Sequence, residues 1–396
     1  MPPRSSIRPP TRQPTRPDTL AQSLLHAVHA QDFANTPDSW HGGSAIANFP
    51  SIDLAVAVFP RGHARGQRTR CANVLFSREH PQGVIGEIGM GGMGGTGGGA
   101  LRNVRFDRDV QDAKGNSIAW QAGRNWRQIN WQPVTARAAG AGTLRFVAPY
   151  PASLLKLMVA VGVGMALDRG LIGDWPAAVE PMIVVSDNDA TTELVALLHR
   201  VGMVDALNAR FAAVGLATLQ LNDTQQDGGW RNGDGAGVGH IHMTAWDSVR
   251  LLWLLDADAP PAPWLPAGTV LLQPATREHL RGVLQRQQLD HVLSSGSLRD
   301  VPGWLPGLAD APAFAHKTGN TDNYASDAGI LRTDDGNHDG NHDGTHDGTH
   351  AIVALLSNLG TRYAPQAGCA TTWRVPALGA AIGRLLARTG SGLQAK

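Results

Sequence analysis

Lysine is rare in this chain, and two of its four lysines lie next to hydroxyl residues at spacings that suit chemistry. Lys156 follows Ser153 by three positions, and Lys317 directly precedes Thr318, whereas thirty other basic residues are arginines. Arginine stays protonated under ordinary conditions, but a lysine ammonium loses its proton more easily when it is desolvated or lies near another cation. Residues three apart on a helix share one face, so Lys156 can act as a base on the Ser153 hydroxyl. The pair therefore predicts nucleophilic catalysis by a serine.

The chain contains, in order, the motifs Ser153-x-x-Lys156, Ser186-Asp187-Asn188 and Lys317-Thr318-Gly319. Each motif alone is weak evidence, because a serine before a helix and a glycine in a turn are common. In this order they resemble the motifs of the penicillin-recognising serine hydrolases, which include class A β-lactamases and penicillin-binding proteins. The resemblance covers about residues 145–390. It implies a serine hydrolase that forms an acyl-enzyme through Ser153, most like a class A β-lactamase acting on a β-lactam or a related amide or ester.

The resemblance assigns the nucleophile and its surroundings. Ser153 would be the nucleophile at the start of a helix, where unpaired N–H groups and the dipole favour negative charge. Lys156 would be its base, and a second cation near it would help to lower its pKa. The oxyanion hole would be formed by the backbone N–H groups of Ser153 and Asn320.

The other motif residues are assigned to proton transfer and substrate binding by the same resemblance. Ser186 would pass a proton to the leaving nitrogen, and Asn188 would hydrogen-bond the substrate amide. Lys317 would hold the Ser186 hydroxyl and, together with Thr318, would bind a substrate carboxylate. Gly319 belongs to the same substrate-binding segment.

Two departures from class A β-lactamases affect the expected function. Ser153 and Ser186 are only thirty-three residues apart, which removes a wall of the cleft and predicts a more open site. The stretch 219–239 contains no glutamate to activate the deacylating water, and its carboxylates are Asp223, Asp227 and Asp234. A solvated loop aspartate is the simpler interpretation of each. Two alternatives therefore stay open: a penicillin-binding-type peptidase or esterase with slow deacylation, and a non-catalytic binding or sensor domain.

Hydrophobic periodicity predicts the elements that position these residues. The expected helices are 19–31, 153–167, 191–200, 204–214, 244–255, 277–289 and 376–387; the expected strands are 53–59, 117–120, 126–131, 325–331 and 351–356. The fold class is therefore α/β of the α+β type: an antiparallel sheet flanked by N- and C-terminal helices, plus an all-helical lobe, as in β-lactamases and transpeptidases.

The chain divides into three expected parts. Residues 1–18 are expected to be a disordered basic tail with no apolar core of a secretory signal, and residues 19–150 are expected to hold the first helix, the first strands and a Gly-rich insertion. Residues 151–396 are the catalytic region, with the helical lobe at about 151–300 and the sheet and last helix at about 310–390. The glycine tract 86–99 lacks the lysine of a P-loop and is expected to be a loop.

Histidines cluster in the chain without a convincing metal-ligand spacing. Residues 335–350 repeat Asp-Gly-Asn/Thr-His, and we expect an expanded hairpin loop rather than a metal site, because glycine in every unit prevents preorganisation. His240 and His242 lack a visible third ligand and are expected to be surface or packing residues. His316 could tune Lys317, but an ordinary hydrogen bond is the simpler expectation. No metal or cofactor is expected.

Composition limits the class of partner. A net charge of +1 provides no field for nucleic acid or anionic membranes, and the longest apolar run is too short to span a bilayer. The expected partner is a small-molecule or peptide-like acyl substrate, and the sequence does not indicate an oligomeric state. Cys71 and Cys369 permit one disulfide without requiring it. Members of the resembled superfamily generally work outside the cytoplasm, so an extracytoplasmic or periplasmic location is expected from the resemblance alone.

Overall fold

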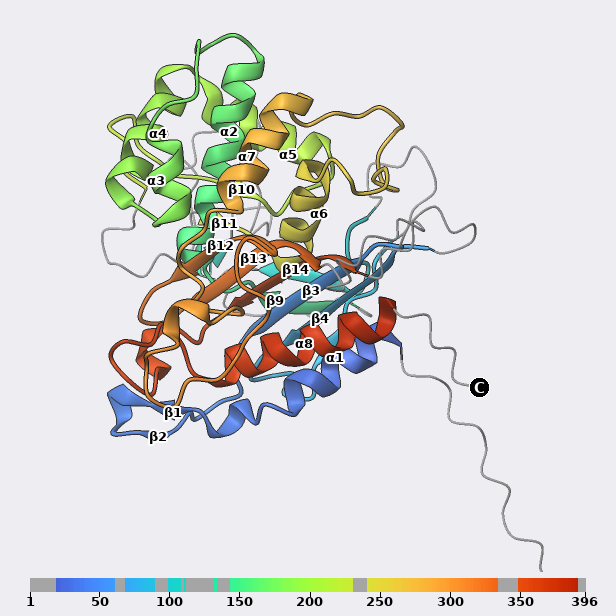
Figure 1. The fold of residues 1–396 in the computed structure, drawn as a ribbon, viewed down its shortest axis with the longest axis vertical. Helices are drawn as coiled ribbons and strands as arrows, with labels where there is room; N and C mark the ends of the chain where they lie inside the picture. Colours follow the sequence, from blue (N-terminus) through green and yellow to red (C-terminus); the bar gives the residue numbers. More distant parts are fainter. Residues whose placement is uncertain are drawn as a thin grey trace, which may run out of the picture.

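A six-stranded antiparallel sheet lies at the centre of the computed structural model (Figure 1). Its strand order is β12–β13–β14–β3–β4–β5, so strands from both ends of the chain form one sheet. The strands are β3 (Ile52–Val58), β4 (Arg70–Phe76), β5 (Val84–Ile85), β12 (Phe314–Asn320), β13 (Ala325–Thr333) and β14 (Thr349–Ser357). The structure describes residues 19–60, 68–89, 99–107, 110–111, 132–133, 143–230, 241–333 and 348–390.

Helices of the two chain ends cover one face of this sheet. α1 (Leu20–His29) begins at a capping box of Thr19 with Gln22, and α8 (Arg374–Gly390) lies beside it across the strands (Figure 1). Successive side chains of a strand point to opposite faces, so alternate residues of β3, among them Leu54 and Val56, pack in the core under α1 and α8. The residues between them pack against the helical lobe.

The other face of the sheet carries the helical lobe. Its helices are α2 (Lys156–Asp168), α3 (Val179–Val184), α4 (Asn188–Arg200), α5 (Met203–Ala213), α6 (Ala245–Leu255) and α7 (Pro274–Leu284). α2 is buried along almost its whole length because it is apolar on every side, and Gly170 ends it in the left-handed conformation with a φ of 68°. The expected fold class is confirmed.

Shorter elements complete the chain. The minor strands are β1 (Pro37–Asp38), β2 (Ser44–Ala45), β6 (Val104–Asp107), β7 (Val110–Gln111), β8 (Gln132–Pro133), β9 (Leu144–Val147), β10 (Gln220–Leu221) and β11 (Ile241–His242). The 3-10 turns are η1 (Phe33–Asn35), η2 (Ser39–His41), η4 (Ala152–Leu155), η5 (Gly296–Leu298) and η6 (Thr361–Tyr363). β6 and β9 pair in parallel outside the main sheet.

Most expected elements occur within a few residues of their expected bounds, but α7 occupies Pro274–Leu284 instead of 277–289. Proline is favoured in the first turn of a helix, where its missing N–H costs nothing, so the helix begins earlier than its apolar periodicity indicates. The expected hairpin is confirmed as β13 paired with β14. Both cysteines are free thiols. The expected tail 1–18, the strands 117–120 and 126–131, and most of the histidine repeat lie outside the described residues.

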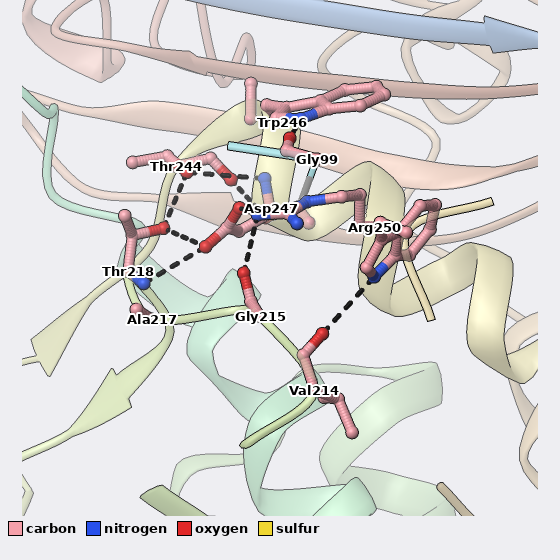
Figure 2. A network of polar contacts seen from close by, with 12 residues as sticks. Gly99, Val214, Gly215, Ala217, Thr218, Thr244, Trp246, Asp247 and Arg250 are labelled. Atoms are coloured by element: carbon pink, nitrogen blue, oxygen red, sulfur yellow. Dashed lines mark hydrogen bonds and ion pairs between the residues drawn. The ribbon is translucent and has the colours of Figure 1, made fainter. Parts of the chain in front are cut away.

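A buried polar network fixes α6 to the segment that leads toward β10 (Figure 2). The Thr218 backbone N–H and hydroxyl both donate to Asp247, at 3.0 and 2.7 Å, and Arg250 pairs with Asp247. Arg250 also donates to the Gly215 carbonyl at 2.7 Å. Buried ions persist when they are paired in this way, so the network sets where the chain emerges after α5. No helix in the described ranges is both long and apolar enough to cross a bilayer.

Candidate active site

Ser153 lies in the short turn η4, one turn before the long helix that was expected to contain it. The α-helix begins at Lys156, so the expected helical start at residue 153 is corrected to a 3-10 turn. Ala152 directly before the serine has a φ of 49°, a left-handed conformation that is unfavourable for a residue with a Cβ. Such backbone strain is concentrated at functional sites, where the surrounding structure holds it in place.

Lys156 is fully buried, and its ammonium contacts the Ser-Asp-Asn loop. Its Nζ donates to the Ser186 hydroxyl at 3.0 Å, to the Ser186 carbonyl at 2.5 Å and to Asn188 Oδ1 at 2.8 Å. The lysine thus connects two of the three motifs directly and shares a turn of chain with the serine.

Lys317 reaches the same hydroxyl from the sheet. Its Nζ donates to Ser186 Oγ at 3.0 Å and to the Thr318 carbonyl at 2.8 Å, and the side chain is fully buried. Ser186 has a φ of 58°, and Asp187 caps the N-terminus of α4, which starts at Asn188. The structure therefore brings the second and third motifs together around one hydroxyl that two lysines share.

Burial and a neighbouring cation affect the charge of Lys317. Desolvation first, and then the charge of Lys156, lower the pKa of Lys317 well below its ordinary value, while Asp327 opposes the shift. A buried lysine with a lowered pKa releases its proton more readily than an exposed lysine does.

β12 is the edge strand of the sheet beside the serine turn. Two ladder bonds, from Arg332 N–H to the Ala313 carbonyl and from Thr321 N–H to the Tyr324 carbonyl, fix which residues of the strand face β13. In an antiparallel ladder the residues between bonded pairs point their backbone groups the other way. The Thr318 and Asn320 backbone groups therefore face the open edge, where a substrate can reach them.

Gly319 allows β12 to pack directly on the serine turn. A Cβ at this position would lie 2.4 Å from the Pro151 carbonyl oxygen and 2.7 Å from the Leu154 nitrogen. Ser326 on β13 strengthens the contact, because its hydroxyl donates to the Pro151 carbonyl at 2.5 Å. The sheet edge and the turn that carries Ser153 are thus held in contact at a position where only glycine fits.

The loop that follows β10 places an indole near Lys156. The Trp230 ring centroid is 5.7 Å from Lys156 Nζ, within the range of a cation–π contact, and its Nε1 donates to the Thr192 hydroxyl at 3.3 Å. Gly228 packs so closely on α4 that a Cβ would lie 2.1 Å from the Thr192 carbonyl oxygen. Asp227 accepts the Gly229 N–H at 3.0 Å, and Asp234 lies outside the described residues.

His316 has more than the ordinary hydrogen bond expected for it. The ring is fully buried, with Nδ1 2.6 Å from Asp327 Oδ1 and Nε2 3.0 Å from Asp290 Oδ1. Burial disfavours the imidazolium, but the charge of Asp327 and the bonds to both aspartates raise the pKa of His316 to about 9. A charged imidazolium donates from both nitrogens, which matches two carboxylate acceptors.

Sequence reasoning missed Trp230, Ser326, Asp290 and Asp327. No motif marks these residues, and their roles depend on tertiary contacts between segments that are far apart in the chain. The alternation of side chains along β13 could have identified Asp327, since a charged residue at a core-facing position of a buried strand requires a partner.

The expected histidine clusters take ordinary places where they are described. His242 lies in β11, and its Nδ1 is 2.7 Å from the Thr218 carbonyl; His350 lies in β14, 2.6 Å from Asp256. Within the described ranges no group of three or more His, Cys, Asp or Glu residues could hold a metal ion. His240 and residues 335–347 lie outside those ranges.

A comparison with protein families finds a match over part of the chain. A model of the β-lactamase enzyme family matches residues 174–338. This match confirms the resemblance to the serine β-lactamase and penicillin-binding superfamily. The matched segment includes Ser186, Asn188 and Lys317–Asn320, and it begins after Ser153 and Lys156.

Solved structures with some likeness are β-lactamases. A β-lactamase from Chitinophaga pinensis is 16% identical with a TM-score of 0.38, and the match covers 61% of this chain and 85% of that chain. An ancestral class A β-lactamase is 18% identical with a TM-score of 0.37, and the match covers 71% of this chain and 92% of that chain. A class D β-lactamase from Sebaldella termitidis is 7% identical with a TM-score of 0.30, and the match covers 54% of this chain and 72% of that chain. No curated protein matched the chain.

Proposed function

We propose that the protein is a serine hydrolase of the β-lactamase type, in which Ser153 forms an acyl-enzyme with a β-lactam or a related amide or ester. The observation that carries the proposal is the Ser186 hydroxyl, which lies 3.0 Å from both Lys156 Nζ and Lys317 Nζ. Two buried lysines around one hydroxyl are costly to fold, and proton transfer gives them a purpose.

Acylation follows from this arrangement. The neutral amine of Lys156 takes the proton of the Ser153 hydroxyl as the oxygen attacks the substrate carbonyl carbon. The resulting oxyanion is stabilised by the backbone N–H groups of Ser153 and Asn320, the latter facing the open edge of β12. As the carbon–nitrogen bond breaks, the Ser186 hydroxyl gives its proton to the leaving nitrogen and regains one from a lysine ammonium. The product is an ester of Ser153.

Substrate binding uses the edge of β12 and the start of α4. Lys317 and the Thr318 hydroxyl suit a substrate carboxylate, and the exposed Asn188 amide suits the carbonyl of an acylamino group. Asn320 Oδ1 is buried and has no hydrogen-bond partner among the described residues, which leaves an acceptor for a substrate N–H. An amide-bearing acid fits these groups.

A slowly deacylating enzyme of the penicillin-binding type is the second candidate. It is favoured by Trp230, which lies near Lys156 in the loop where a class A enzyme carries its glutamate. An indole cannot take a proton from water, so hydrolysis of the ester would depend on Lys156 or on an aspartate of that loop.

The first test is turnover of a chromogenic cephalosporin by the wild type and by Ser153→Ala. We expect hydrolysis that requires Ser153. Equal rates for the two proteins would overturn the proposal. Cys369→Ser provides a matched control, because it exchanges a similarly small side chain outside the three motifs and should leave the rate unchanged.

The second test separates the two candidates. Intact-mass spectrometry after a pulse of penicillin reports the lifetime of the covalent adduct. An adduct that persists for hours favours the penicillin-binding type, whereas turnover without accumulation favours a β-lactamase. Trp230→Glu places a carboxylate in the loop and should shorten the lifetime if the missing base limits deacylation.

A further inference from the structure

The His316 imidazole occupies a site built for a flat ring on the face of β12 opposite Lys317. Gly329 lies across from it on β13, where a Cβ would be 2.3 Å from His316 Cβ, and the Phe314 ring stacks on the imidazole with centroids 4.5 Å apart. Asp327 and Asp290 bind its two nitrogens. The ring therefore has one orientation and two charged partners.

Both carboxylates are themselves held in place by backbone donors. Asp327 is fully buried, and its second oxygen accepts the Leu293 N–H at 3.0 Å, while Asp290 accepts the Ala311 N–H at 3.2 Å. These bonds tie the segment after α7 to β12 and β13. The cluster is thus a rigid group of charges one residue away from the active-site lysine.

The charges around His316 are few and opposed. Asp290 and Asp327 are the acidic groups that bind it, while Lys317 and, beyond it, Lys156 are the basic groups nearby. His291 is a further titratable group here, and burial together with Lys317 and His316 lowers its pKa to about 4, so its ring is neutral. Asp327 attracts both His316 and Lys317, so the two cations compete for one carboxylate.

We propose that His316 is a positioning residue for Lys317: bound to Asp290 and Asp327, it draws the charge of Asp327 to itself and so sets how firmly Lys317 holds its proton. The inference rests on the proposed function, in which Lys317 exchanges a proton with Ser186. With His316 charged, Asp327 is largely neutralised and Lys317 gives up its proton more readily. Without that charge, Asp327 would hold Lys317 as a permanent ammonium.

The alternative is that His316 only stabilises the packing of the strands and does not affect Lys317. The chain offers a matched control in His350, which pairs with Asp256 at 2.6 Å on β14 of the same sheet and belongs to no site described above. His350→Asn removes one histidine–aspartate pair, whereas His316→Asn removes the pairs with both Asp290 and Asp327. Only the change at His316 alters the field at Lys317.

The test is the pH profile of the rate constant for Ser153 acylation by penicillin. The alkaline limb of this profile reports the loss of the proton from Lys317. In His316→Asn we expect this limb to move to higher pH by about one unit, which is the size of effect expected between two interacting titratable groups. His350→Asn should leave the limb where it is. An unmoved limb in His316→Asn, or the same shift in both variants, would overturn the inference. Loss of acylation in every protein, wild type included, would instead refute the proposed function.

A wild-type measurement covers the case in which His316→Asn does not fold. The chain has only four lysines, so ¹³C-labelled lysine yields few signals, and Lys317 is assigned with Lys317→Arg. We expect the Lys317 signal to show a second inflection at the pH where His316 loses its proton. A Lys317 titration with no inflection there contradicts the inference, and this readout does not depend on activity.

Discussion

The two ends of the sheet handle buried charge in different ways. At the β12 end, two lysines and His316 are fully buried among a few carboxylates, next to backbone in unfavourable conformations. At the opposite end of β13 and β14, Arg332 and His350 pair with the buried Asp256, and both of these side chains remain partly exposed. The second arrangement is an ordinary way to satisfy a buried carboxylate. The first keeps cations close together at a cost, which is expected of a site that moves protons.

The largest expected effect is on the free energy of unfolding, whose pH dependence should differ between the His316 cluster and the Asp256 cluster. The folded-state pKa of His316, about 9, exceeds its unfolded value of 6.5, so its stabilisation is complete below pH 6.5 and is lost as pH rises through 9. Burial raises the pKa of Asp256, but the pairing with His350 and Arg332 prevails and lowers this pKa. The ionised Asp256 therefore stabilises the folded protein at pH values above the ordinary aspartate pKa, and this stabilisation is lost on acidification. Denaturant unfolding of His316→Asn should show a destabilisation of about 3 kcal/mol that shrinks toward pH 10. That of Asp256→Asn should shrink toward pH 3 instead. The same pH trend in both variants would contradict the contrast.

The next largest effect is expected for Lys156→Arg. The variant keeps the positive charge and most of the volume but cannot lose a proton, so the acylation rate should fall on the order of a hundredfold or more. Stopped-flow measurement with a chromogenic cephalosporin reports this rate. Lys114→Arg makes the same replacement outside the motifs and should leave it unchanged. An unaltered rate in Lys156→Arg would remove the lysine from the role of base.

Gly319→Ala should disturb the contact between β12 and the serine turn. The added methyl group would meet the Pro151 carbonyl and the Leu154 nitrogen, and overpacking of this kind costs about 1–3 kcal/mol. Because the strain falls on the turn of Ser153, we expect acylation to slow about tenfold, with a drop in Tm of a few degrees. Gly282→Ala, where a Cβ meets only the end of an arginine side chain, is the control. Equal acylation by both variants would show that the close approach is not needed.

The smallest effect is expected for Lys317→Arg. Arginine preserves a cation for the substrate carboxylate, so KM should change by less than about fivefold. If proton exchange with Ser186 matters as proposed, kcat should fall more than KM rises, which steady-state kinetics at several pH values separates. A rise in KM alone would reduce Lys317 to a binding residue.

Short motifs and hydrophobic periodicity made the local parts of the candidate site recognisable in the sequence. Ser153, Lys156, Ser186 and Lys317 were recognisable because each lies in a short motif, and the helices and strands that carry them follow from hydrophobic periodicity. The family match and the observed sheet with its helical lobe confirm the resemblance and the fold class. The roles of the individual site residues stay predictions.

The rest could not be predicted from local patterns. Trp230 reaches Lys156 because Gly228 lets its loop pack on α4, and the aspartates around His316 come from two segments that meet only in the folded protein. The strained φ angles of Ala152 and Ser186 likewise come from tertiary packing, since neither residue type favours that conformation. Contacts between distant segments decide these features.

In the proposed reaction the Ser153 hydroxyl oxygen is the atom that becomes acylated. Peptide mapping by tandem mass spectrometry after penicillin treatment tests this directly, because it identifies the residue that carries the added mass. We predict a penicilloyl group on the peptide that contains Ser153, and none in Ser153→Ala. A modification on any other residue, or no modification of a folded protein together with no hydrolysis of penicillin, would contradict the account.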